Sequence, residues 1–140
     1  MSALHSSTVQ LPATDAAVLA VLIDAGGFAS WNPALTSVDC PDPVAVVGAA
    51  YPATVRGVIP ATFTYELIEP RRVVHRLAFR GFEELGEWEL EPAGDGATRV
   101  THSFRQTGPV AALIPAGAAG VADLRTGRLR DEVQRRSSVG

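Results

Sequence analysis

The chain has 140 residues, of which 46% are hydrophobic and 19% charged, the composition of one globular domain with a sizeable core. Its net charge of −3 argues against nucleic acid as a partner, because phosphate binding needs a clustered positive surface. No apolar run approaches the roughly 20 residues of a membrane span, and the N-terminus lacks a basic region followed by a long apolar core. We therefore expect a single cytoplasmic domain over residues 1–140.

The residue types present exclude several kinds of site. All twelve basic residues are arginine, so neither a lysine Schiff base nor a P-loop lysine is available. The single cysteine, Cys40, excludes an internal disulfide. His5 falls in a terminal strand and Cys40 in a loop, so no cluster has the spacing of metal ligands. We expect neither a metal nor another cofactor.

The first part of the chain predicts a strand, two short helices and two further strands. The first strand spans 4–11, the helices 16–24 and 28–31, and the next strands 35–39 and 44–58, the last centred on its second half. The residues that delimit the helices are Thr14 or Asp15 as the first N-cap, Gly26-Gly27 as its stop, and Asn32-Pro33 after the second.

Residues 61–107 form successive runs of alternating apolar and polar residues, joined by turns at 69–71 and 94–96. A period of two places one set of side chains on a buried face and the other in solvent. The segment is therefore predicted to be an antiparallel meander. The inward positions are Phe63, Tyr65, Leu67, Val73, His75, Leu77, Phe79, Phe82, Glu84, Gly86, Trp88, Leu90, Val100, His102 and Phe104.

After Gly108-Pro109 the spacing becomes helical and predicts a long C-terminal helix that covers the apolar face of the sheet. Its first half contains Pro115, Gly117 and Gly120, although an interior glycine costs about 1 kcal/mol and a proline about 3. Either these residues allow close backbone packing, or they leave a space between helix and sheet. The expected apolar positions are Val110, Leu113, Ile114, Gly117, Val121, Leu124, Leu129 and Val133, and the solvated ones Asp123, Arg125, Arg128, Arg130 and Asp131.

Several stretches, together with the order of these elements, are typical of one superfamily. They are Leu11-Pro12-Ala13-Thr14-Asp15, Phe28-Ala29-Ser30-Trp31-Asn32-Pro33, Tyr65-Glu66-Leu67-Ile68-Glu69-Pro70 and Gly94-Asp95-Gly96-Ala97-Thr98-Arg99-Val100. Over nearly its whole length the chain resembles the START-like helix-grip superfamily, also called SRPBCC, and within it the bacterial polyketide cyclase/dehydratase group. The resemblance implies an α+β fold in which a seven-stranded curved antiparallel sheet wraps around a long C-terminal helix, with two short helices between strands 1 and 2. Known members hold an apolar small molecule in a cavity between helix and sheet.

The catalytic candidates are His75, His102 and Tyr65, which share a phase with the core. Histidine exchanges a proton near neutral pH, as cyclisation and dehydration require. Each histidine can equally be a hydrogen-bonded core residue. Tyr65 has an apolar ring that suits the core and a hydroxyl that would face the cavity.

The ligand-binding candidates are the other aromatic and polar residues expected near the cavity. Glu84 shares the inward phase, but its place beside the Gly81 turn favours exposure. Arg56 points outward by simple alternation, and only a bulge would turn it inward, where it could stabilise an enolate. Trp31 and Trp88 suit cavity walls and an aromatic core equally. The full set is Trp31, Tyr51, Arg56, Phe63, Phe79, Glu84, Trp88, Phe104, Leu113 and Gly117.

These observations favour a domain that binds a small hydrophobic, polyketide- or lipid-like molecule. Our leading hypothesis is cyclisation or dehydration of such a substrate by general acid–base groups in a dry pocket. The main alternative is a non-catalytic carrier or sequestering protein with the same pocket, and a third is a protein-binding module. Fold alone does not choose between them. A homodimer is left open.

Overall fold

The computed structural model describes residues 4–33, 35–113 and 120–139, and the elements follow the predicted order. The strands are β1 (Leu4–Leu11), β2 (Ser37–Val38), β3 (Ala50–Val55), β4 (Ile59–Glu69), β5 (Arg72–Phe79), β6 (Phe82–Pro92) and β7 (Thr98–Thr107). The helices are α1 (Asp15–Leu22) and α2 (Val121–Val139), with short 3₁₀ helices η1 (Ala25–Ser30) and η2 (Ala111–Leu113).

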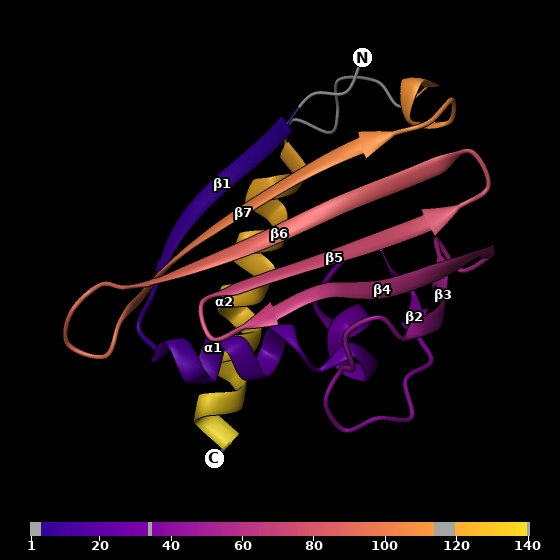
Figure 1. Cartoon of the computed structure of the whole chain (residues 1–140). Coiled ribbons are helices and arrows are strands. Elements are labelled where there is room, and N and C mark those ends of the chain that lie inside the picture. Colours follow the sequence, from indigo (N-terminus) through magenta and orange to yellow (C-terminus); the bar gives the residue numbers. More distant parts are fainter. Residues whose placement is uncertain (1–3, 34, 114–119, 140) are drawn as a thin grey trace.

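The seven strands form one antiparallel sheet in the order β1-β7-β6-β5-β4-β3-β2 (Figure 1). Six strands, β2 to β7, follow one another as a meander, and β7 pairs with β1 along the whole length of β1. One face of the sheet carries α2, which packs mainly against β1, β7 and α1. This arrangement confirms the helix-grip fold, with α1 and η1 as the short helices between β1 and β2.

The two short helices are held by side-chain caps. Thr14 is the N-cap of α1, since its Oγ1 accepts the N–H of Ala17 at 3.2 Å. Asp24 caps η1 in the same way through the N–H of Gly27, at 3.1 Å. The expected stop at Gly26-Gly27 is wrong: α1 ends at Leu22, and both glycines lie inside η1, where the Asp24 carboxylate holds the turn.

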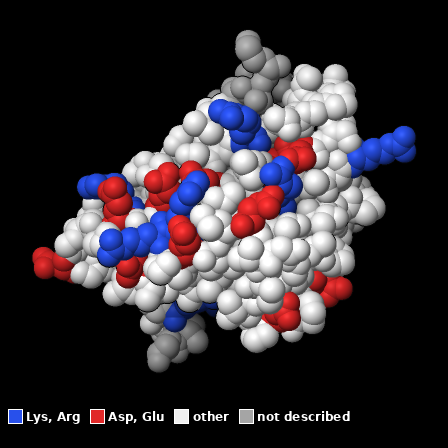
Figure 2. Space-filling view, viewed as in Figure 1, with Lys and Arg blue, Asp and Glu red and all other residues white. Residues whose placement is uncertain are grey.

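The inward phase of the meander is confirmed by burial except at Leu67. A β-bulge after Tyr65 pairs Leu67 with the outward-facing Val74, and Ile68 packs on the core in its place. Side chains at alternate positions of β5, β6 and β7 are buried, whereas the outer face carries charged residues of both signs. Figure 2 shows these acidic and basic side chains interleaved on the outer face, where they pair as Arg72–Glu87, Arg76–Glu66, Arg76–Glu83 and Arg99–Glu91. The β6–β7 hairpin turns through Asp95, at a φ of 41°, between two glycines with φ of 81° and 75°.

The C-terminal helix differs from its prediction. Residues 114–119, which include Ile114, Pro115 and Gly117, lie outside the described residues, and α2 begins at Val121. The expected apolar phase is confirmed at Leu129 and Val133, which are buried, but is wrong in the first part of α2, where Leu124 is 45% exposed and Val121 only half-buried. The prediction counted the helical spacing of apolar residues forward from Val110. The buried face of α2 follows a different count. Its buried positions recur at three and four residues: Ala122, Arg125, Thr126, Leu129, Glu132 and Val133.

Candidate functional site

The inner face of the sheet is buried along most of β5 and only partly covered where β4 begins and β5 ends. Along β4, Tyr65 and Phe63 are buried, but Ala61 and Ile59 are half-buried. Along β5, Phe79 is half-buried at the end of an otherwise buried inward row. We call Ile59, Ala61 and Phe79 the half-covered end. All three pack against the main core, so they face inward.

A charged pair crosses from the sheet to α2 beside the half-covered end. Arg125 is 2% exposed and Glu84 4%, and both oxygens of the carboxylate accept guanidinium N–H groups at 2.9 Å. Gln106 Nε2 donates to Glu84 Oε1, also at 2.9 Å. The guanidinium carbon lies 4.5 Å from the centre of the Phe104 ring, as in a cation–π contact. We call Glu84, Gln106, Arg125 and His102 the inner polar cluster.

Two expectations are corrected by this pair. Glu84 is buried rather than exposed, because the strand is already regular at that position and Arg125 supplies the opposite charge. Arg125 is buried rather than solvated, because α2 turns this position towards the sheet. Burial alone would raise the pKa of Glu84, but the charge of Arg125 and hydrogen bonds from Arg125 and Gln106 outweigh it and lower that pKa. The pair is therefore ionised at neutral pH.

His102 is a neutral member of the cluster with a defined tautomer. Its Nδ1 lies 3.0 Å from the carbonyl oxygen of Glu87, which can only accept, so Nδ1 carries the proton. Nε2 then faces Arg125 Nη1 at 3.4 Å as an acceptor. Burial, with Arg125 and His75 nearby, lowers the pKa of His102 well below its ordinary value. The ring stacks on Trp88 with 3.8 Å between centroids.

His75 is also neutral, and its free nitrogen is a donor. Trp88 Nε1 donates to His75 Nε2 at 2.8 Å, so the proton sits on Nδ1, for which the described residues supply no acceptor. Burial lowers the pKa of His75 to about 4. The ring lies over Gly86, where an added Cβ would come within 2.5 Å of His75 Cε1. Glycine at this position of β6 thus makes room for the histidine.

The two tyrosines act as ties to neighbouring elements. Tyr65 donates its hydroxyl to the carbonyl oxygen of Leu22 at 2.5 Å, which joins β4 to the end of α1. Burial raises the pKa of Tyr65 well above its usual value. Tyr51 donates to Asp42 and accepts the N–H of Val46, both at 2.8 Å, and burial raises its pKa to about 12. The hydroxyl groups of Tyr65 and Tyr51 are therefore both occupied by hydrogen bonds to neighbouring helix and loop residues.

Most of the aromatic candidates are joined by ring contacts into one cluster, and Phe79 forms a separate pair with Phe82. Trp31 is buried, with ring centroids 4.5 Å from Phe28 and 5.6 Å from Trp88, and its Nε1 has no acceptor. Phe63 lies 5.0 Å from Phe28 and 5.1 Å from His75. Phe104 stacks near His102 at 5.6 Å, and Phe79 stacks on Phe82 at 4.7 Å at the half-covered end.

Two further candidates, Arg56 and Leu113, lie apart from this cluster. Arg56 is exposed in the β3–β4 turn at a φ of 52°, so the bulge that would have turned it inward is not there. Leu113 is 81% exposed in η2. Gly117 lies outside the described residues. Sequence reasoning missed Arg125 as an inner-face residue; the inward phase of Glu84 was the one signal for a buried counter-charge.

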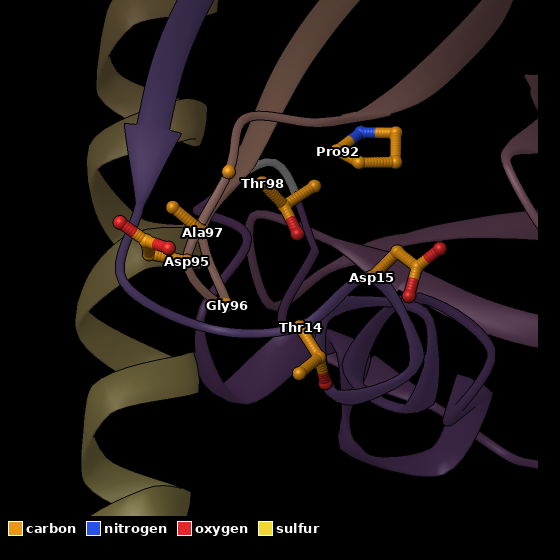
Figure 3. Close-up of a pocket in the computed structure, with 8 residues that line it drawn as sticks. Thr14, Asp15, Pro92, Asp95, Gly96, Ala97 and Thr98 are labelled. Carbon is orange, nitrogen blue, oxygen red and sulfur yellow. The ribbon is translucent and has the colours of Figure 1, made fainter.

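A separate hollow of about 230 Å³ lies on the surface between the start of α1 and the β6–β7 hairpin (Figure 3). Its lining consists mainly of small and turn residues: Thr14, Asp15, Pro92, Gly94, Asp95, Gly96, Ala97 and Thr98. Thr14 is engaged in capping α1 and Thr98 donates to the Ala13 carbonyl. None of these residues was a candidate, and the described part of the chain holds no group of three His, Cys, Asp or Glu side chains suited to a metal ion.

Known structures share this architecture. Ara h 8.0201 is 12% identical, with a TM-score of 0.73 and 100% of both chains covered. A START superfamily protein from Mycobacterium smegmatis is 15% identical, with a TM-score of 0.67, over 94% of this chain and 97% of that one. A norcoclaurine synthase mutant from Thalictrum flavum, in complex with a transition-state analogue, is 12% identical, with a TM-score of 0.69, over 98% and 97%. At such identities the likeness shows the fold alone, and no curated protein matched the chain.

The fold is thus that of the START-like helix-grip proteins, a class that bends an antiparallel sheet around its last helix. The sequence model of the family described as polyketide cyclase / dehydrase and lipid transport matches residues 3–134, and the chain belongs to that family. Family and fold are those of helix-grip proteins that bind hydrophobic ligands. None of the helices in the described ranges has the length and apolar character that a membrane crossing needs.

Proposed function

We propose that the protein binds a small, mainly apolar molecule at the half-covered end of the inner face, and that it acts as a carrier rather than as a catalyst. The observation that carries this proposal is the state of the two inward histidines. Both are neutral, and the Nε2 lone pair of each faces an N–H donor of the protein, Trp88 for His75 and Arg125 for His102.

A general base needs a free lone pair and a pKa near the working pH. His75 meets neither condition, since its pKa is lowered to about 4 and its Nε2 accepts the Trp88 N–H. His102 has a pKa shifted in the same direction by burial. Tyr65 is held by the carbonyl of Leu22, with its pKa raised by burial. These three residues support the fold around a ligand better than they support proton transfer.

The place of binding is supported by the burial pattern. Inward-facing apolar side chains are left half-buried at Ile59, Ala61 and Phe79, while the next inward residues of the same strands, Phe63 and Leu77, are buried. Partly covered apolar side chains next to a few polar groups are what small-molecule sites offer. The family description, which includes lipid transport, agrees with an apolar ligand.

Cyclisation or dehydration of a polyketide-like substrate is the second candidate. It is favoured by one observation: Nδ1–H of His75 is a buried donor without an acceptor, and such a group can polarise a substrate carbonyl. If this function holds, His75→Ala and His102→Ala abolish turnover while the apolar ligand still binds. Normal turnover by both variants would remove the catalytic assignment.

A fluorescence titration with N-phenyl-1-naphthylamine, a neutral apolar probe, tests the binding proposal. Ala61→Trp fills the half-covered end and should weaken probe binding about tenfold or more. Thr62→Trp, one residue along β4 on the exposed outer face, is the matched control and should bind as the wild type does. A wild-type protein that does not bind the probe, or equal affinities in the two variants, would refute the proposal.

A further inference from the structure

Arg125 has one edge of its guanidinium unused. Its Nη1 and Nη2 each donate to one oxygen of Glu84, and Nη1 also lies beside His102 Nε2. Nε has no acceptor although it is fully buried. Because Nη2 lies on the same side as Nε–H and carries a second hydrogen, these two donors form a parallel fork that the described residues leave open.

Two other buried donors in the core lack acceptors among the described residues. In the described part of the chain the unpartnered buried side-chain atoms are Trp31 Nε1, His75 Nδ1 and Arg125 Nε. With the tautomer of His75 fixed by Trp88, all three are N–H donors. A buried donor without a partner is costly, so a ligand that complements these donors must bring acceptors.

The charge of the pair decides which kind of acceptor fits. All twelve arginines lie in the described part of the chain, and Arg125 alone is buried. Its charge is already balanced by Glu84, whose pKa is lowered by that partnership. A ligand carboxylate at the open fork would add a buried charge with no second cation to balance it. An uncharged oxygen adds none.

We infer that Arg125 determines the specificity of the site by receiving an uncharged acceptor group of the ligand, such as a ketone, ester or amide carbonyl, while Glu84 acts as a fixed counter-charge that rejects carboxylates. The inference rests on the proposed binding function. The Glu84–Arg125 pair lies near the proposed binding place. Glu84 is two residues along β6 from Phe82, which stacks on Phe79 of the half-covered end. Arg125 Nε is covered in the structure, so the ligand group must displace part of this packing.

Three naphthalenes with similar shapes test the selectivity, each displacing N-phenyl-1-naphthylamine at pH 7.5. They are 2-acetylnaphthalene, the hydrocarbon 2-isopropenylnaphthalene and 2-naphthoate. A hydrogen bond to a charged donor predicts that the ketone binds about tenfold or more tightly than the hydrocarbon. The naphthoate should bind more weakly than the ketone. Equal binding of ketone and hydrocarbon, or tightest binding of naphthoate, would overturn the inference.

Glu84→Gln isolates the role of the counter-charge. With the carboxylate gone, Arg125 is an unbalanced cation, and naphthoate should bind about tenfold or more tightly than to the wild type, while the hydrocarbon is unaffected. Glu83→Gln, the neighbouring residue on the outer face of β6, is the matched control and should keep the wild-type order. Unchanged naphthoate binding to Glu84→Gln would contradict the inference.

If Glu84→Gln fails to fold, a double variant tests whether Arg125 determines the preference for the ketone. Glu84→Leu with Arg125→Met removes both charges, and should bind the hydrocarbon normally but lose the preference for the ketone. A retained preference would overturn the role of Arg125. A wild-type protein that binds neither the probe nor any of the naphthalenes would refute the proposed function itself, which separates that failure from failure of the inference.

Discussion

The indole N–H of Trp88 donates to Nε2 of His75 across the β5–β6 pair at 2.8 Å, and this bond fixes the protonation of the imidazole. The ring must be neutral with its proton on Nδ1, because Nε2 is occupied as an acceptor. His102 has the same tautomer for a different reason, since its Nδ1 donates to the Glu87 carbonyl. Two neutral histidines therefore flank one tryptophan in the core.

This arrangement predicts a loss of stability in mild acid. The unfolded chain binds a proton on His75 near pH 6.5, whereas the folded chain does so only near pH 4. Lowering the pH between these values favours the unfolded state, and the full shift corresponds to on the order of 3 kcal/mol. His102 acts in the same direction. Urea unfolding at pH 7.5, 6 and 5 should show this fall, which His75→Gln should reduce; a flat profile in the wild type would contradict it.

Gly86→Ala should destabilise the protein. The new Cβ would lie 2.5 Å from Cε1 and 3.0 Å from Nδ1 of His75, whose ring is pinned by Trp88, so neither side can move freely. Overpacking of this kind costs about 1–3 kcal/mol. Gly120→Ala, where a Cβ meets nothing within 4 Å, is the control and should be tolerated. Denaturant midpoints compare the two, and equal stabilities would show that His75 is not held in place.

Breaking the Glu84–Arg125 pair should cost more than removing it. Arg125→Met leaves a buried carboxylate without its partner, for which losses of about 3–5 kcal/mol are usual. Arg125→Met combined with Glu84→Leu removes both charges and should recover much of that loss. Arg128→Met, on the exposed side of α2, should have little effect. Additive effects of the two cluster substitutions in a double-mutant cycle would show that the pair is not coupled.

Trp31 should be essential for folding, because its ring is buried against Phe28 and Trp88. Trp31→Ala should lower the free energy of unfolding by about 3–5 kcal/mol, a large part of a typical domain's stability. Trp31→Phe should fold, but with altered affinity for the apolar probe. Thermal melts and probe titrations measure both effects, and an unchanged melting temperature for Trp31→Ala would contradict the observed packing.

The fold could be predicted because the alternation of apolar and polar residues identifies the strands and their buried face. Strands β5 to β7 show the period of two clearly, and the inward phase of His75, His102 and even Glu84 was correct from spacing alone. In β4 the bulge after Tyr65 breaks the alternation, and spacing alone placed Leu67 on the wrong face. The error at Glu84 came from setting that phase aside, on the argument that a carboxylate near a turn prefers solvent. In the structure Glu84 is buried, because Arg125 in the distant helix α2 supplies the opposite charge.

The polar part of the site could not be predicted for the same reason. Arg125 is 41 residues from Glu84, and nothing in either local sequence connects them. Helical spacing counted from Val110 placed Arg125 on the outer side, and this count is wrong because α2 starts its own phase at Val121. Tautomers and open N–H groups depend on contacts within 3–4 Å, which no residue pattern encodes.

The pairing of β1 with β7 has a consequence for how the chain acquires its structure during synthesis. Strand β1 has no strand partner until Thr98–Thr107 has been made, and its register matches Leu4 with Arg105. Asp24, which caps η1, likewise accepts a hydrogen bond from Arg136, which lies 112 residues later in the chain. Contacts of such long sequence separation slow folding, since a large loop must close before they form. The elements at the start of the chain therefore cannot complete their contacts in advance of the rest, and we expect β1, η1, β7 and α2 to fold together as one cooperative unit.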